Sequence, residues 1–321
     1  MRPLKPQIFE EDEIRSLFEL FPSKKWEFLN YLLFIGAKSS SLILSYSANP
    51  GSQNVAHKLA LSLNKFGFNV FLPTSPAPIS ALSLALGERN FSLGIYLSRT
   101  LDGKWAILPL APHGGLINNE DLPAIPPNFS SSAGVIGEID LTTKYIRKIA
   151  GLLDPEPEKG VRLSVLDSPF SSIEQHFFNH KDFSVFSERD PLGPIAKVDS
   201  SGQSLSISLE KASFLSSKEM VEIIGNYLIK VRHSGGTALS PEGNSDITLE
   251  FGDSVDSVEI EGDAWDMSFK AGFVNLFMGW WDPGIIVHQG HGPFGDAFVT
   301  LGYILEALSN ERAMSTILGK D

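Results

Sequence analysis

The first half of the chain alternates short apolar runs with segments of helical periodicity, and this alternation constrains the fold more than any other feature of the sequence. Ser41–Ser47, Asn69–Leu72 and Ser92–Leu97 have the length and apolar content of buried strands. Gln53–Phe66 and Ile79–Leu86 lie between them and repeat apolar side chains at helical spacing. Strands that alternate with helices over short loops predict an α/β fold with helices on the faces of a sheet.

The pattern continues with interruptions to the end of the chain. Asp154–Gly160 (DPEPEKG) is rich in proline and charge, which indicates a linker, and Asp199–Gly202 indicates a hairpin turn. The other main elements expected are strands at Lys104–Pro109, Val161–Leu166, Phe183–Phe186, Ile195–Val198 and Leu205–Ile207, and helices at Thr142–Leu153, Ser172–Asn179, Lys218–His233 and Gly295–Leu308.

Charge and composition exclude several classes of function. The net charge is −12, with 38 acidic and 26 basic residues, which argues against nucleic acid or an anionic membrane as the main partner. There is no cysteine, so disulfides and thiolate chemistry are excluded. The longest apolar stretch, Tyr31–Ala37, is far shorter than the ~20 residues of a membrane helix. We therefore expect a cytoplasmic protein.

Three segments of the first unit resemble the α-D-phosphohexomutases, the family of phosphoglucomutase and phosphomannomutase. Lys65–Val70 (KFGFNV) and Pro73–Pro78 (PTSPAP) are similar to the family's strand and PTP-type turn. Leu93–Thr100 (LGIYLSRT) is similar to the strand that leads into the T-A-S-H-N-P loop, whose serine carries the transferred phosphate. The resemblance places Ser98 at the phosphoserine position, on the loop after the strand. It also implies Arg99, with Lys104, as partners of the phosphate.

The C-terminal part resembles domain 3 of the same family. Gly279–Ile286 (GWWDPGII) is similar to the sugar-binding G-G-E-x-S-G-H-I loop, and His291–Phe298 (HGPFGDAF) is similar to the turn and helix that follow it. The resemblance implies that Asp282 is a sugar ligand. Trp281 could stack on a sugar face. The alternative is that Trp280 and Trp281 only fill space in a cleft or an interface.

The metal loop is where the chain departs most from the family. The family's D-G-D-A-D-R loop is replaced by Ser187–Pro194 (SERDPLGP). A magnesium ion needs several oxygen ligands at close range, and Asp190, with Glu188, is what remains. The resemblance therefore implies Mg²⁺ bound at Asp190 only if the ancestral activity is retained.

The resemblance also divides the chain into domains. Residues 1–153 correspond to domain 1 with an N-terminal helical extension, 161–210 to a shortened domain 2, and 211–321 to domain 3. The expected fold class is α/β with phosphohexomutase-type mixed sheets. The family's fourth domain, with its phosphate-gripping R-x-S-G-T-E-P loop, is expected to be absent. A homodimer or a partner chain could then cover the open cleft.

Three smaller features have structural interpretations. His288, His291 and Asp296 could bind a metal, but Asp296 could equally offset the dipole of the last helix. Ser52 is expected to cap the helix that follows it. His113–Gly115 is expected to be a turn whose backbone requires glycine.

Two functions follow from these observations. The first is a phosphohexomutase-like protein of carbohydrate metabolism with lost or altered mutase activity, which binds a sugar, a phosphosugar or a protein. The alternative is an active mutase, an intramolecular phosphotransferase that uses Ser98 as phosphoryl carrier. A mutase must grip a distal phosphate, and no unassigned basic cluster in the sequence supplies that grip, which favours the first.

Overall fold

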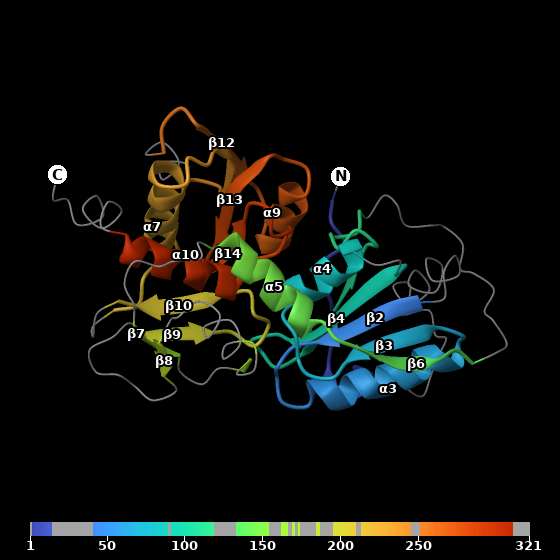
Figure 1. Cartoon of the computed structure of the whole chain (residues 1–321). Coiled ribbons are helices and arrows are strands. Elements are labelled where there is room, and N and C mark those ends of the chain that lie inside the picture. The colour runs from blue at the N-terminus through green and yellow to red at the C-terminus, as the bar shows by residue number, and fades with distance from the viewer. Residues whose placement is uncertain are drawn as a thin grey trace. The chain divides into compact units, whose positions relative to one another are not determined.

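The protein is described by a computed structural model that covers residues 2–14, 41–88, 91–118, 133–153, 162–165, 169–170, 173, 184–186, 195–209, 213–244 and 251–310. Two compact units make up the chain, 1–144 and 145–321, and the boundary falls within helix α5 (Thr142–Leu152). Within the described ranges, none of the helices has the length and apolar character that crossing a membrane requires. Figure 1 labels the elements.

Unit 1 is built on a six-stranded mixed sheet of order β1-β5-β4-β2-β3-β6. β4, β2, β3 and β6 are parallel, whereas β5 pairs antiparallel with β4, and β1 pairs antiparallel with β5. β2 therefore lies between β3 and β4, so the connection from β3 to β4 passes over β2. The strand bounds are β1 Gln7–Phe9, β2 Ser41–Tyr46, β3 Asn69–Pro73, β4 Leu93–Arg99, β5 Trp105–Leu110 and β6 Ile136–Ile139.

Two helices cover opposite faces of this sheet (Figure 1). α3 (Ser52–Lys65) packs on the face that carries Leu42, Leu44 and the odd-numbered residues of β4. α4 (Ile79–Glu88) covers the other face, where a Cβ on Gly94 would lie 2.4 Å from Leu86 Cδ1. The alternation of strands and helices predicted from the sequence is confirmed here.

Two loop expectations in unit 1 had different outcomes. The capping role expected for Ser52 is wrong, because Gly51 holds the cap position with φ +84° and no side chain caps the helix. The turn at His113–Gly115 does require glycine. Gly114 has φ +83°, and a Cβ there would lie 2.1 Å from the Ser83 carbonyl oxygen.

Unit 2 contains two four-stranded sheets, of order β10-β9-β7-β8 and β12-β11-β13-β14. The Asp199–Gly202 turn joins antiparallel β9 and β10 as predicted. The expected helix at Ser172–Asn179 lies outside the described residues apart from Ile173. The strand bounds are β7 Arg162–Val165, β8 Ser184–Phe186, β9 Ile195–Val198, β10 Leu205–Ser208, β11 Gly236–Pro241, β12 Val255–Ile260, β13 Leu276–Trp281 and β14 Ile285–His288.

The helices of unit 2 centre on α10 (Ala297–Ser309), which lies between the two sheets (Figure 1). α9 (Ala264–Ala271) covers one face of the β12-β11-β13-β14 sheet, and α7 (Ser217–Lys230) covers the other face together with α10. Nearly every side chain of α10 is buried, because strands of both sheets and α7 all pack against it. A helix that is apolar on all sides is typical of such a central position.

Candidate functional site

Ser98, the candidate phosphoryl carrier, lies in β4 rather than on the loop after it. Its partner across the sheet is Ala106 of β5, and the antiparallel pairing continues to Arg99 and Trp105. Pairing with β5 therefore extends the strand by two residues beyond the apolar run, and the expected loop placement is wrong. Ser98 is half-buried, at the carboxyl end of a parallel strand, which is where α/β sheets bind ligands.

Arg99, the expected phosphate partner, is held by groups of its own unit. Its Nη2 atom lies 3.1 Å from Glu11 Oε2, and its guanidinium carbon lies 4.3 Å from the centre of the Trp105 ring. The indole of Trp105 donates to the same Glu11 oxygen at 2.7 Å. A carboxylate and an aromatic face thus contact the guanidinium, whose Nε atom has no acceptor among the described residues.

Lys104 is paired in the same way. Its Nζ atom lies 2.9 Å from Glu10 Oε1 and 3.6 Å from Asp102 Oδ2. The hydrogen bond to Glu10 and its negative charge raise the pKa of Lys104. Both cations expected to hold a phosphate beside Ser98 are therefore neutralised by carboxylates.

Asn49 joins the carboxyl ends of β2 and β4. Its Oδ1 atom accepts hydrogen bonds from the Arg99 backbone N–H at 3.2 Å and from Ser47 Oγ at 2.7 Å. These contacts fix the loop before α3 against the strand that carries Ser98.

Trp281 and Asp282 lie at the β13–β14 turn of unit 2. Trp281 ends β13 and is half-buried against the apolar cluster under α9, whereas Asp282 is exposed. The turn is fixed because Gly284 N–H donates to Ser217 Oγ at 2.8 Å and the Gly284 carbonyl accepts from Leu205 N–H at 3.0 Å. The turn therefore presents a carboxylate to solvent beside a partly exposed aromatic ring.

Trp280 has a different role from Trp281. It is only 3% exposed and fills the interior of unit 2. This core position of Trp280 is neither the cleft nor the interface that the space-filling interpretation expected.

Asp190, the expected magnesium ligand, lies outside the described residues with the rest of Ser187–Pro194. Within the described ranges, no group of three or more His, Cys, Asp or Glu side chains could hold a metal ion. The described residues therefore do not make up a magnesium site, and no catalytic step is assigned to an ion.

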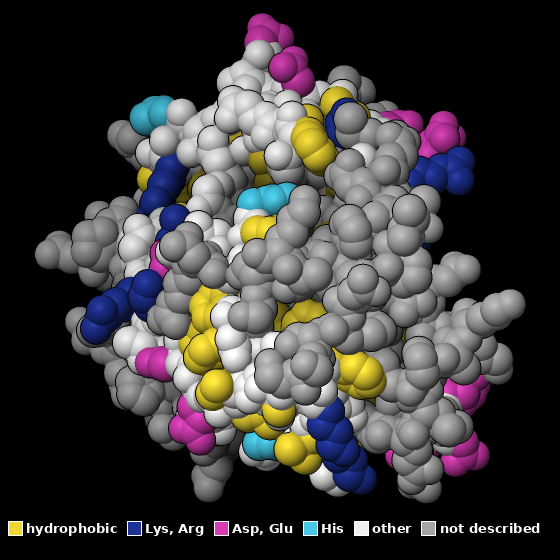
Figure 2. Space-filling model, turned by 90° about the vertical axis from the view of Figure 1, so that its right-hand side faces the viewer, with side chains coloured by type: hydrophobic (Ala, Val, Ile, Leu, Met, Phe, Trp, Pro, Cys, Tyr) yellow, Lys and Arg dark blue, Asp and Glu magenta, His cyan; other side chains and the backbone are white. Residues whose placement is uncertain are grey.

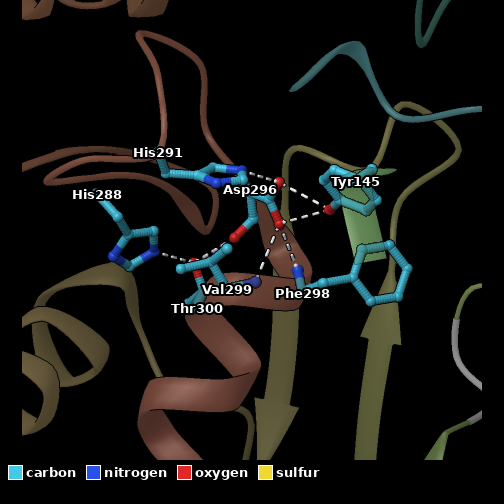
Figure 3. A network of polar contacts seen from close by, with 7 residues as sticks. All are labelled: Tyr145, His288, His291, Asp296, Phe298, Val299 and Thr300. Carbon is cyan, nitrogen blue, oxygen red and sulfur yellow. Dashed lines mark hydrogen bonds and ion pairs between the residues drawn. The ribbon is translucent and has the colours of Figure 1, made fainter. Parts of the chain in front are cut away.

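A buried polar network surrounds Asp296, the N-cap of α10 (Figure 3). Its carboxylate accepts hydrogen bonds from both Phe298 N–H and Val299 N–H, and the Tyr145 hydroxyl lies 2.8 and 2.9 Å from its two oxygens. His291 Nε2 lies 2.6 Å from Asp296 Oδ2, with both side chains fully buried. The carboxylate therefore has a full set of donors, which suits a structural anchor.

His288 is neutral and its tautomer follows from its neighbours. The Thr300 hydroxyl donates to the Asp296 carbonyl at 2.7 Å, so the hydroxyl oxygen must accept from His288 Nε2, also at 2.7 Å. Burial, and secondly the nearby His291, lower the pKa of His288 to about 3. These contacts, and the absence of a metal-binding group in the described part of the chain, count against the metal alternative for His288, His291 and Asp296.

Known proteins resemble this chain in structure. No protein-family model and no curated protein matches its sequence. A Thermus thermophilus protein assigned as a phosphomannomutase is 15% identical with a TM-score of 0.75, over 91% of this chain and 78% of that one. A phosphoglucomutase/phosphomannomutase family protein of Burkholderia thailandensis is 11% identical with a TM-score of 0.75, over 99% and 79%. Parafusin, a phosphoglucomutase of Paramecium, is 11% identical with a TM-score of 0.64, over 97% and 72%.

The chain has the phosphohexomutase fold. The phosphohexomutase resemblance noted in the sequence and the expected α/β fold class are therefore confirmed for the fold. On this phosphohexomutase fold, the described residues place Ser98, Arg99 and Lys104 together in unit 1, and Trp281 and Asp282 together in unit 2.

Sequence reasoning missed the acidic partners of the cations and the tyrosine of the buried network. Glu11 lies 88 positions before Arg99, and Glu10 lies even further before Lys104. Tyr145 lies 151 positions before Asp296. The acidic N-terminal run that holds Glu10 and Glu11 was the one available signal. Nothing in the local sequence distinguishes Tyr145 from an apolar helix residue.

Proposed function

We propose that this phosphohexomutase-fold protein acts in carbohydrate metabolism by binding a sugar or phosphosugar, with lost or altered mutase activity. The observation that carries the proposal is the pairing of Arg99 and Lys104 with Glu11, Glu10 and Asp102 beside Ser98. We also propose a cytoplasmic location and a second copy of the chain as a macromolecular partner.

The electrostatics around Ser98 support the loss or change of activity. Phosphoryl transfer depends on positioning and on positive charge that stabilises the phosphate oxygens. Two cations and three carboxylates meet at the β4–β5 hairpin, which leaves one net negative charge there. An incoming phosphate would have to compete with those carboxylates. On the face shown in Figure 2, the described Lys and Arg side chains are scattered among acidic ones and form no basic patch.

The β13–β14 turn supports the sugar-binding part of the proposal. Carboxylates accept hydrogen bonds from sugar hydroxyls, and aromatic rings pack on sugar faces. Asp282 and Trp281 supply one group of each kind on a turn that is held rigidly by Ser217 and Leu205. Asp282 is exposed and Trp281 is half-buried, so both can be reached by a ligand.

A coupled assay tests the catalytic part. Purified protein with Mg²⁺ and a trace of glucose 1,6-bisphosphate is given glucose 1-phosphate, and glucose 6-phosphate is measured through its dehydrogenase. We expect no turnover above a blank, and no added phosphate on the intact protein by mass spectrometry. Turnover that is abolished by Ser98→Ala would establish the alternative function, an active mutase.

Calorimetry tests the binding part separately. Glucose, glucose 1-phosphate and glucose 6-phosphate are titrated into the wild type and Asp282→Asn. We expect measurable binding of at least one ligand and weaker binding by the variant. Glu261→Gln, a second exposed carboxylate of unit 2, is the matched control and should bind as the wild type does. Equal binding by wild type and Asp282→Asn would contradict the role of the turn.

A further inference from the structure

Four buried polar atoms in the described part of unit 2 lack hydrogen-bond partners, and one of them is His291 Nδ1 of the Asp296 network. The other three are Ser240 Oγ, Trp280 Nε1 and His288 Nδ1, on residues that are 0%, 3% and 1% exposed. None of the three has a partner within the part of the chain that the structure describes. Buried polar groups are nearly always hydrogen-bonded, to protein or to ordered water, so each of these requires an explanation.

The three side chains come from adjacent strands of one sheet. Leu239 of β11 is in register with Gly279 of β13, which places Ser240 beside Trp280. β14 follows on the other side of β13, where His288 pairs with Met278, two residues before Trp280. Serine, tryptophan and histidine thus occupy neighbouring positions across β11, β13 and β14.

They also share one face of that sheet. Leu239 and Val287 belong to the apolar cluster that contains Met267 of α9, and a Cβ on Gly279 would lie 3.2 Å from the Met267 sulfur. Side chains alternate between the faces of a strand, so Ser240, Trp280 and His288 point away from α9. That face is the one covered by α7 and α10 (Figure 1).

The hydrogen-bonding characters of the three atoms are complementary. The indole N–H of Trp280 can only donate. His288 Nδ1 can only accept, because the Nε2 proton is given to Thr300. The Ser240 hydroxyl can do both. A cation would be repelled by the indole N–H and an anion by the Nδ1 lone pair, so the set suits a small neutral molecule that both donates and accepts.

We propose that Ser240, Trp280 and His288 bind one or more ordered water molecules between the sheet and the α7–α10 layer. Water is the smallest neutral molecule that both donates and accepts hydrogen bonds, and globular proteins hold about one buried water per 27 residues. The indole donates to this water, and His288 Nδ1 accepts from it. The site lies beneath the hairpin of Trp281 and Asp282 but does not depend on the proposed function.

Nuclear magnetic resonance of the wild-type protein tests the site directly. We expect a cross-relaxation peak between water and the Trp280 indole proton, with the sign of a water that stays bound for longer than a nanosecond. Trp281→Phe, on the opposite sheet face, should leave this peak in place. Assignment of the peak comes from its disappearance in Trp280→Phe.

A high-resolution crystal structure provides the second measurement. We expect density for water within about 3.2 Å of at least two of the three atoms, the outer limit of an N–H···O hydrogen bond, and loss of that density or a shifted position in Ser240→Ala. A dry interior would overturn the proposal, as would a direct hydrogen bond from Trp280 Nε1 to Ser240 Oγ. Density for an ion at this site would show that the bound species is not water, and would overturn the proposal.

Discussion

The β4–β5 hairpin of unit 1 and the Asp296 network of unit 2 both pair acidic groups with basic or polar partners, but the hairpin pairs are partly exposed and the network is fully buried. In the hairpin, the Arg99 and Glu11 side chains are 33% and 48% exposed. In the network, the His291 and Asp296 side chains are both 0% exposed. The two clusters contain similar kinds of side chain, but only those of the hairpin are in contact with solvent.

Burial decides what each cluster can do. Exposed ion pairs contribute little to stability and can exchange partners, so a ligand could displace Glu10 and Glu11. A buried carboxylate cannot lose its donors without a large cost, so Asp296 is a fixed structural element. The sequence interpretation had assigned possible chemistry to both places, and only the hairpin has groups that a ligand could reach.

The largest predicted effect is the pH dependence contributed by His288. Its pKa is lowered to about 3 in the folded protein from 6.5 in the unfolded chain, so only the unfolded chain takes up the proton between those values. The stabilisation from neutral His288 is complete above pH 6.5, falls as the pH drops, and is lost by about pH 3. The difference between these two pKa values corresponds to about 5 kcal/mol of unfolding free energy.

Urea unfolding at pH values from 7 to 4 measures this effect. The unfolding free energy of the wild type should fall relative to that of His288→Gln by about 3 kcal/mol between pH 6.5 and pH 4. His57→Gln, at an exposed position of α3, is the control and should follow the wild type. Parallel curves for wild type and His288→Gln would mean that His288 is not held neutral by burial.

The second prediction concerns the buried carboxylate itself. Asp296→Ala leaves the Tyr145 hydroxyl, His291 Nε2 and two backbone N–H groups without their acceptor. We expect a loss of about 4 kcal/mol in unfolding free energy, measured by urea denaturation.

Asp263→Ala is the matched control, because Asp263 also caps a helix by accepting from two backbone N–H groups but is only half-buried. Its loss should be about 1 kcal/mol. Equal losses for the two variants would show that Tyr145 and His291 add nothing to the cap, and the comparison between the two regions would fail.

The third prediction releases the cations of the hairpin. The double substitution Glu10→Gln and Glu11→Gln removes the carboxylates that neutralise Lys104 and Arg99. We expect the dissociation constant for inorganic phosphate to fall about tenfold at low ionic strength, and the gain to shrink with added salt. Glu88→Gln removes the partner of Lys144 in the same unit and should leave phosphate binding unchanged. Identical titrations for wild type and double variant would argue against masking by the acids.

The smallest predicted effect is the loss of the exposed pair itself. Arg99→Gln should change the unfolding free energy by about 1 kcal/mol or less, because the pair is partly exposed to solvent. Lys144→Gln, which removes another exposed ion pair of unit 1, should be similar. A loss several times larger in thermal or urea unfolding would mean that the stacking of Arg99 on Trp105 dominates the hairpin.

Local sequence patterns predicted the elements of the fold well. The strands and helices between Ser41 and Leu97 were found because apolar periodicity is a local property. The end of β4 was placed two residues early, since its extension depends on pairing with β5, which the run of apolar residues does not record. Ser52 was assigned as a cap because the left-handed backbone of Gly51 is not evident from residue type alone.

The candidate sites were predicted less completely, for a related reason. Asp296 was recognised as a residue at a helix start, and the structure confirms its capping contacts. The donors that surround it from Tyr145 and His291 follow from tertiary packing, which for Tyr145 spans more than a hundred residues. Whether a cation such as Arg99 is free to bind a ligand or is paired with a carboxylate also depends on residues far away in the sequence.

The central position of α10 has a consequence for the order of folding during synthesis. Unit 1 is complete once Lys144 has left the ribosome, and domains generally fold in order from the N-terminus. The sheets of unit 2 are made earlier than α10 yet pack around it, so neither can bury its inner face completely until Ser309 has emerged. Unit 2 must therefore remain unfinished, with apolar strands partly uncovered, until the end of α10 is made, and this interval is when a chaperone would be needed most.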